Sequence, residues 1–163
     1  MHWRALTTLD LPLVETIAAN VHPDFPEDAM VFAERQALYP DGTRLLELDG
    51  VPSGYILSHP WRFKALPPLN SLLGALPADP DTFYIHDLAL LNPARGTGAA
   101  AMIVGETLRH ARAAGFTNIS LVAVNGSLPF WHKHGFRALK VPELDDKLAS
   151  YEAAARFMVK PLV

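Results

Sequence analysis

The chain has 163 residues, of which 50% are hydrophobic and 19% are charged, and this composition and length predict a single ordered domain over residues 1–163. The formal net charge of -3 provides no basic field for nucleic acid or an anionic membrane, and no apolar run approaches the ~20 residues that span a bilayer. The sequence contains no cysteine, which excludes disulfides, thiolate metal sites and a cysteine nucleophile and favours a cytoplasmic location.

The hydrophobic pattern along the chain alternates between short strand-like runs and longer helix-like segments. Strands are expected at residues 3–6, 43–48, 54–58, 82–91, 118–124, 136–141 and 155–159. Helices are expected from a cap at Thr8 or Asp10 to about residue 20, from Pro26 to Pro40, and at residues 98–114, 127–134 and 143–151. Strands that alternate with helices in the middle of the chain indicate at least one parallel crossover.

Residues 59–81 interrupt this alternation with an apolar stretch that contains five prolines. A long apolar loop inside a small domain usually acts as a lid, a binding loop or a surface for a partner, and it can equally provide extra cover for the core. We expect a short helix at residues 69–76. The apolar side chains of residues 61–76 are a candidate homodimer surface.

Two glycines, Gly96 and Gly98, stand between the strand at residues 82–91 and the helix that follows it. Glycine lets the backbone approach a ligand closely, and the first amides of a helix have no partners within the helix. The helix dipole favours an anion at this end, and a neighbouring arginine adds a planar positive group. The turn therefore predicts a pyrophosphate cradle made by Arg95, Gly96, Thr97, Gly98, Ala99 and Ala100.

Three other interpretations compete with this cradle. A P-loop requires Lys and Ser or Thr after its second glycine, where this chain has Ala99 and Ala100. A dinucleotide fingerprint requires a third glycine and an acidic residue about 20 residues later. This chain has Ala101 and the apolar run 119–124 at those places, so a nucleotide-binding enzyme is the weaker alternative. A plain strand–turn–helix without a ligand is the third interpretation.

The turn resembles the cofactor motif of the GNAT superfamily of N-acetyltransferases, Arg/Gln-x-x-Gly-x-Gly/Ala, which Arg95, Gly98 and Ala100 match. The strand before the turn is similar to the fourth strand of that family. A second similarity lies at residues 122–136, where Asn125 ends a strand and a short helix with Trp131 closes on Gly-Phe. The two motifs stand at the separation typical of the family, and the resemblance covers residues 82–139 well.

This resemblance implies an α+β fold with a mixed, mostly antiparallel sheet of about six to seven strands, flanked by helices and splayed between strands 4 and 5. It implies acetyl-CoA as cosubstrate. No spacing of His, Asp and Glu residues indicates a metal site, so no metal is expected. The pantetheine arm would pair with the amides of Leu88, Ala89 and Leu90, one of which would face the thioester oxygen. Asn125 would hydrogen-bond the cofactor arm or cap the next helix, and Trp131 would pack on the cofactor or fill the core.

Direct transfer to an amine with a pKa of ~10.4 requires a base or a dry pocket. The base glutamate of many relatives corresponds to Tyr84, and tyrosine is a poor base at neutral pH. His86, one pleat further along the strand, titrates in the right range and is the preferred candidate. In a regular strand Tyr84, His86 and Leu88 share one face, and Phe83, Ile85 and Asp87 share the other.

The tyrosine that protonates the leaving thiolate in many relatives corresponds to Trp131, whose indole is not a useful acid. Tyr151, Tyr55 or water would take that role, or no acid is needed, because a thiol of pKa ~8.5 can leave as a thiolate. The acceptor site has less definite candidates, which stand in segments that could form its wall: His22, Asp24, Phe25, Glu34, Arg35, His59 and Trp61. Asp24 or Glu34 could attract a cationic amine or be solvated surface acids.

The sequence thus predicts an acetyl-CoA-dependent N-acetyltransferase that acts on the primary amine of a small molecule or peptide by direct transfer. No covalent enzyme intermediate is expected, because there is no cysteine and no serine in a recognisable triad. A non-catalytic acyl-CoA-binding or sensor module is the alternative, favoured by Trp131 and Tyr84 at the two positions discussed. Neither nucleic acid nor a membrane is an expected partner.

Overall fold

In a computed structural model that describes residues 1–163, the chain forms one mixed sheet with the strand order β1-β2-β3-β4-β5-β7-β6. The strands are β1 (His2–Ala5), β2 (Thr43–Leu48), β3 (Val51–Trp61), β4 (Thr82–Leu90), β5 (Asn118–Ala123), β6 (Arg137–Ala138) and β7 (Arg156–Pro161). Only the central pair β4–β5 is parallel. The predicted α+β class and mostly antiparallel sheet are confirmed.

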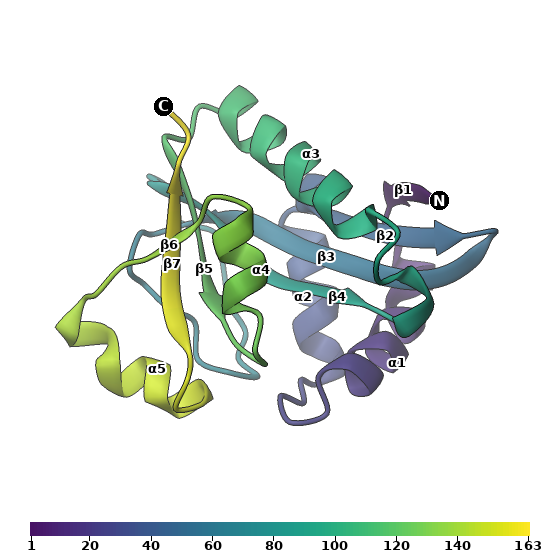
Figure 1. The fold of residues 1–163 in the computed structure, drawn as a ribbon, viewed down its shortest axis with the longest axis horizontal. Coiled ribbons are helices and arrows are strands. Elements are labelled where there is room, and N and C mark those ends of the chain that lie inside the picture. Colours follow the sequence, from purple (N-terminus) through teal and green to yellow (C-terminus); the bar gives the residue numbers. More distant parts are fainter.

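Helices cover both faces of this sheet, with α3 on one face and α1 and α2 on the other (Figure 1). They are α1 (Leu11–Val21), α2 (Ala29–Leu38), α3 (Ala99–Ala113), α4 (Leu128–Lys133) and α5 (Asp145–Tyr151), with single 3-10 turns at Thr8–Asp10, Pro40–Gly42, Asn92–Ala94 and Pro142–Leu144. Ile103 and Val104 of α3 are buried in the core of the first face. Val14 and Ile17 of α1 and Phe32 of α2 are buried in the core of the second.

The two central strands separate along their length. Their pairing consists of Phe83↔Ile119, Tyr84↔Ser120 and Ile85↔Leu121 and ends there. Beyond this point β4 continues on β3 and β5 continues on β7, so the sheet opens between strands that stay paired on their outer sides. The expected splay between the fourth and fifth strands is confirmed, and Figure 1 shows β4 and β5 diverging beside α4.

A β-bulge on β4 lies at the point where the strands part. Ile85 pairs with Ser58 and Asp87 pairs with Leu57, so His86 is an extra residue opposite two consecutive residues of β3. A bulge puts successive residues on one side and bends the strand. The strand therefore turns away from β5 immediately after its last parallel pair.

The bulge overturns the predicted alternation of side chains along β4. Leu88 packs in the same core as Ile85, whereas Tyr84 packs in a separate cluster with Leu66. Asp87 accepts a hydrogen bond from Tyr55, which is buried on the α1–α2 face. The expectation that Tyr84 and Leu88 share one face, and Ile85 and Asp87 the other, was wrong because it assumed a regular strand.

The structure also corrects two boundaries. β3 is longer than predicted and includes Pro52 and Pro60, and β6 has two residues instead of six. No helix in the chain is both long enough and apolar enough to cross a membrane.

Residues 62–81 contain no helix, contrary to the expectation for residues 69–76. The carboxylate of Glu34 on α2 accepts hydrogen bonds from the backbone amides of Leu73 at 2.6 Å and Gly74 at 3.0 Å. Because these two amides already donate hydrogen bonds to Glu34, a local helix is not needed to pair them. Leu66 from the same segment is buried, as expected for extra core cover, whereas Leu69 and Leu72 are exposed.

Candidate active site

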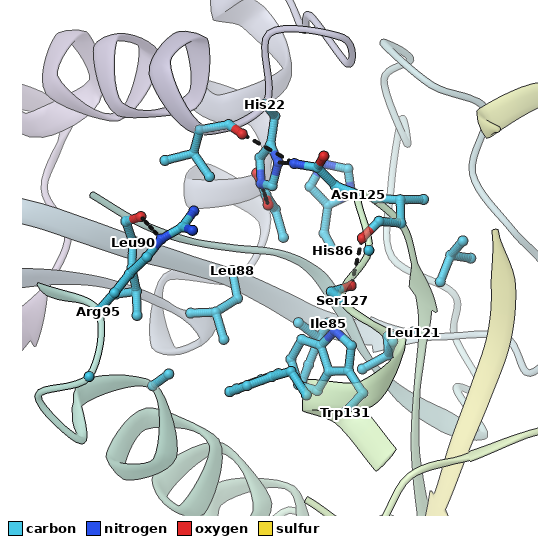
Figure 2. A pocket seen from close by; sticks show the side chains of 18 residues that line it. His22, Ile85, His86, Leu88, Leu90, Arg95, Leu121, Asn125, Ser127 and Trp131 are labelled. Atoms are coloured by element: carbon cyan, nitrogen blue, oxygen red, sulfur yellow. Dashed lines mark hydrogen bonds and ion pairs between the residues drawn. The ribbon is translucent and has the colours of Figure 1, made fainter. Parts of the chain in front are cut away.

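A cavity of about 400 Å³ occupies the opening between β4 and β5 (Figure 2). It is lined by 18 residues from β4, β5 and the loop that follows it, α4, the turn before α3 with the first turn of α3, and the end of α1. The predicted cofactor and catalytic residues that line it are His86, Leu88, Leu90, Arg95, Gly96, Ala100, Asn125 and Trp131, and His22, a candidate for the acceptor site, lines it as well. The two sequence motifs therefore meet around one cavity.

Other predicted site residues lie away from this cavity. Tyr84 is buried with Leu66 below the 62–81 segment, and burial raises the pKa of its hydroxyl well above the usual value. Tyr151 on α5 donates its hydroxyl hydrogen bond to the carbonyl of Pro67, and burial likewise raises its pKa. Tyr55 is fully buried and donates to Asp87. No tyrosine lines the cavity, so none is placed there to act as an acid.

The edge of β4 that faces the cavity carries free backbone groups. The amide of Leu91 donates to the carbonyl of Ser53 on β3 at 2.8 Å. Backbone groups alternate sides along a strand, so the amide of Ala89 also faces β3 and those of Leu88 and Leu90 face the opening. Ala89 is 1% exposed and packs on the α1–α2 face. The open edge thus presents Leu88 and Leu90.

The turn before α3 gathers unpaired amides at one end of the cavity. Gly96 and Gly98 have φ angles of 75° and 87°, a left-handed conformation that L-residues adopt at a cost. The amide of Ala99 donates to the hydroxyl of Thr97 at 3.2 Å. No hydrogen bond within the chain uses the amides of Gly96, Thr97, Gly98, Ala100 and Ala101. The turn can therefore accept an anion through several donors at once.

Arg95 stands beside these amides with an exposed side chain. Its only hydrogen bond within the chain is weak, from Nε to the carbonyl of Leu90 at 3.4 Å, and Figure 2 shows it reaching back to that strand. The guanidinium is free to turn toward an anion at the cradle. Ala99 itself is buried, and its carbonyl accepts a hydrogen bond from the Trp3 indole at 3.0 Å, which fixes the start of the helix.

His86 is hydrogen-bonded to Glu27, which lies between α1 and α2. Its Nε2 is 2.9 Å from Oε1 of Glu27, and the His86 and Glu27 side chains are 11% and 8% exposed. An ionised carboxylate can only accept, so Nε2 carries the proton and, in neutral imidazole, Nδ1 carries the lone pair. Nδ1 has no hydrogen-bond partner in the chain, and His86 lines the cavity. The arrangement suits proton abstraction from a ligand.

A second network joins the two sides of the opening. His22, which follows α1, contacts Asp87 through Nε2 at 2.8 Å, and Asn125 Nδ2 lies 3.3 Å from its Nδ1. Burial lowers the pKa of His22, but the hydrogen bond and charge of Asp87 outweigh burial and raise it overall. Burial raises the pKa of Asp87, but the hydrogen bond and the charge of His22, with smaller contributions that include the hydrogen bond from Tyr55, together outweigh burial and lower it. The pair is therefore favoured as ions.

Asn125 makes different contacts from those expected for a helix cap. It has a positive φ of 56°, and its side chain donates to the carbonyl of Val21 at 3.2 Å (Figure 2). The residue at the start of α4 is Ser127, and no side chain caps that helix. The capping prediction for Asn125 is thus wrong, because its side chain holds the end of α1 against the loop after β5.

Trp131 fills the core, which is one of the two roles expected for it, and packing on the cofactor stays a prediction. It is 6% exposed and packs edge-to-face on Phe136, with ring centroids 5.3 Å apart, while it also lines the cavity. The residue that sequence reasoning missed is Glu27. It is separated from His86 by 59 positions, and no local pattern marks a pair formed only by tertiary packing. No group of His, Cys, Asp and Glu is arranged to hold a metal.

The open parallel strand pair, the amide-rich turn and the cavity between them define an acyltransferase of the GNAT type. Residues 7–136 match the model of the acetyltransferase (GNAT) family, and the chain belongs to that family. No curated protein sequence matches the chain significantly.

Solved structures share the fold at low sequence identity. The loading GNATL domain of CurA from Lyngbya majuscula is 15% identical with a TM-score of 0.79, covering 99% of this chain and 97% of that one. GphF, a GNAT-like decarboxylase solved with isobutyryl-CoA, is 14% identical with a TM-score of 0.78 and covers 100% of both chains. Arabidopsis thaliana Naa50, solved with the bisubstrate analogue CoA-Ac-MVNAL, is 15% identical with a TM-score of 0.72. The match covers 97% of this chain and 95% of that one.

Proposed function

We propose that this chain transfers an acetyl group from acetyl-CoA directly to a primary amine. The observation that carries the proposal is the open edge of β4 leading into the turn before α3, with His86 beside the same cavity. A location in the cytoplasm and a homodimer remain predictions from the sequence.

The cofactor would extend along the cavity from the turn to the bulge. Its pyrophosphate would accept hydrogen bonds from the free amides between Gly96 and Ala101, with Arg95 turning to add charge. The pantetheine arm would pair with the backbone of Leu88 and Leu90 as an added strand. The Leu88 amide would donate to the thioester oxygen and stabilise the oxyanion of the tetrahedral intermediate. Naa50 and GphF, solved with CoA-containing ligands, support a coenzyme in this fold.

His86 would act as the general base. Nδ1 would take a proton from the acceptor ammonium or from the attacking amine, and Glu27 would stabilise the imidazolium that forms. The amine nitrogen then attacks the thioester carbon, the carbon–sulfur bond breaks, and any remaining surplus proton on the nitrogen is lost to water. GphF shares this fold and is named a decarboxylase, so the fold alone does not indicate an amine acceptor. The proposal of an amine acceptor is based instead on His86 and Glu27.

The coenzyme would leave as a thiolate that takes a proton from water. No tyrosine lines the cavity, and a thiol of pKa ~8.5 leaves at modest cost near neutral pH. The same absence favours a non-catalytic acyl-CoA-binding module as the second candidate. Binding without turnover separates this candidate from an enzyme.

Isothermal titration with acetyl-CoA, followed by thiol release with a panel of primary amines, tests the proposal. Binding together with amine-dependent thiol release is the expected result. Binding without release by any amine would favour the binding module, and no binding by folded protein up to millimolar concentration would refute both.

A further inference from the structure

A second group of polar side chains lies buried beside His86, under the 62–81 segment. It consists of Glu27, Arg35 on α2 and His59 on β3. The Glu27 side chain is 8% exposed, that of Arg35 is 1% exposed, and the residue His59 is 1% exposed. Each of the three has at least one buried polar atom without a hydrogen-bond partner. Buried polar atoms are nearly always paired, so this concentration requires an explanation.

The guanidinium of Arg35 is satisfied on one side only. Nη1 donates to Glu34 Oε1 at 3.0 Å and to the carbonyl of Ser71 at 3.2 Å. Nε and Nη2, which lie on the same edge of the planar group, have no partner. Two parallel N–H donors on one edge match the two oxygens of a carboxylate. The free edge of Arg35 is therefore a preformed carboxylate fork.

The remaining unpaired atoms are acceptors. His59 Nδ1 is 2.8 Å from the carbonyl of Pro60, so Nδ1 carries the proton and Nε2 has the free lone pair. Burial lowers the pKa of His59 to about 3, which keeps this ring neutral. Glu27 Oε2 is the other unpaired acceptor. These atoms suit the N–H donors of an ammonium or amine.

None of these three side chains lines the cavity, but they form one electrostatic unit that is connected to the cavity through His86. The charge of Glu27 acts on Arg35, and the charges of His86 and Arg35 act on His59. Glu27 holds His86, which lines the cavity. The carboxylate fork and the candidate base are thus linked through Glu27.

We propose that the acceptor is a small amine that also carries a carboxylate, with Arg35 Nε and Nη2 binding the carboxylate while Glu27 and His86 receive the amine. This inference rests on the proposed acetyl transfer and specifies its substrate class. The 62–81 segment, which Glu34 anchors to α2, would cover the bound acceptor.

The test compares the standard L-amino acids with their primary amides, which keep the amine and side chain but lose the negative charge. Thermal shift of the protein saturated with CoA reports binding, and thiol release from acetyl-CoA reports transfer. We expect at least one acid to bind and to react at least tenfold better than its amide, because the amide leaves Arg35 unpaired. Arg35→Lys, which has no fork, should lose that preference, whereas the exposed control Arg109→Lys should keep it.

The comparison on the unmodified protein decides the inference even if Arg35→Lys does not fold. Amides that equal or exceed their acids throughout the panel would overturn it. So would a panel in which no acid binds up to millimolar concentration while acetyl-CoA still binds in isothermal titration. A crystal structure with the preferred acceptor bound, but with only water on Arg35 Nε and Nη2, would also overturn it. Failure of acetyl-CoA binding itself would instead refute the proposed function.

Discussion

Glu27 accepts a hydrogen bond from Nε2 of His86 at 2.9 Å, which joins the segment between α1 and α2 to the bulge of β4. The contact fixes the orientation of the imidazole and leaves Nδ1 as its free nitrogen. It also places a carboxylate where it can stabilise the protonated ring. The proposed chemistry depends on this pair, and the first prediction follows from it.

His86→Gln should lower the rate of acetyl transfer by about 10²–10⁴-fold, because glutamine cannot take the proton. The dissociation constant of acetyl-CoA, measured by calorimetry, should stay within about twofold of the original value, since no proposed cofactor contact changes. Glu27→Gln should reduce the rate by a smaller factor, since its amide oxygen can still accept from Nε2. A His86→Gln variant with unchanged transfer would exclude His86 as the base.

His22 and Asp87 predict a pH-dependent contribution to stability. The pKa of His22 is raised above 6.5 in the folded chain, so its stabilisation is fully present below pH 6.5 and declines as the pH rises through the folded value. The difference in free energy of unfolding between the original chain and His22→Gln should therefore be larger at about pH 6 than at about pH 9. Urea denaturation at both pH values measures it. A difference that grows with pH would show that the ion pair does not stabilise the fold.

Gly98 predicts a specific effect on cofactor binding. Its φ of 87° costs an L-residue about 1–2 kcal/mol, so Gly98→Ala should strain the turn and weaken acetyl-CoA binding by about tenfold. Gly105→Ala, inside α3, is the matched control. There the new methyl group would lie 3.5 Å from Arg109 Nη1, and the variant should gain up to about 1 kcal/mol of stability with unchanged binding. Equal affinities for all three proteins would remove the turn from the proposed site.

Trp131 lines the cavity and should also contribute to the free energy of unfolding of the chain. Trp131→Ala removes a side chain that is 6% exposed and packs on Phe136, so it should lower the free energy of unfolding by about 3–5 kcal/mol. Trp131→Phe keeps an aromatic ring and should lose clearly less. Chemical denaturation measures both losses. A loss below about 1 kcal/mol for the alanine variant would mean that the indole is not part of the core.

Sequence patterns predicted well those helices, strands and turns that depend on residues close together in the chain. The strand, turn and helix around Gly96 and Gly98 were expected from glycine spacing and hydrophobic runs. The paired similarity at Asn125 and Trp131 placed the second wall of the cavity. These features depend on neighbouring residues, so a single sequence contains enough information to locate them.

The features that the sequence did not reveal depend on contacts between distant segments. The bulge at His86 is defined by its register against β3, and alternation along β4 alone cannot indicate it. Tyr151 lies on the predicted helix, but its hydroxyl donates a hydrogen bond to the carbonyl of Pro67 instead of facing the cavity. Glu34 was a candidate for attracting an amine, and its carboxylate instead binds the amides of the 62–81 segment. In each case tertiary packing determined the partner of a polar group.

The most direct test of the central claim is a crystal structure of the chain with coenzyme A. We predict the diphosphate on the free amides between Gly96 and Ala101, and the pantetheine arm hydrogen-bonded to Leu88 and Leu90 along the open edge of β4. A structure with the coenzyme bound elsewhere, or with that edge closed by β5, would contradict the account.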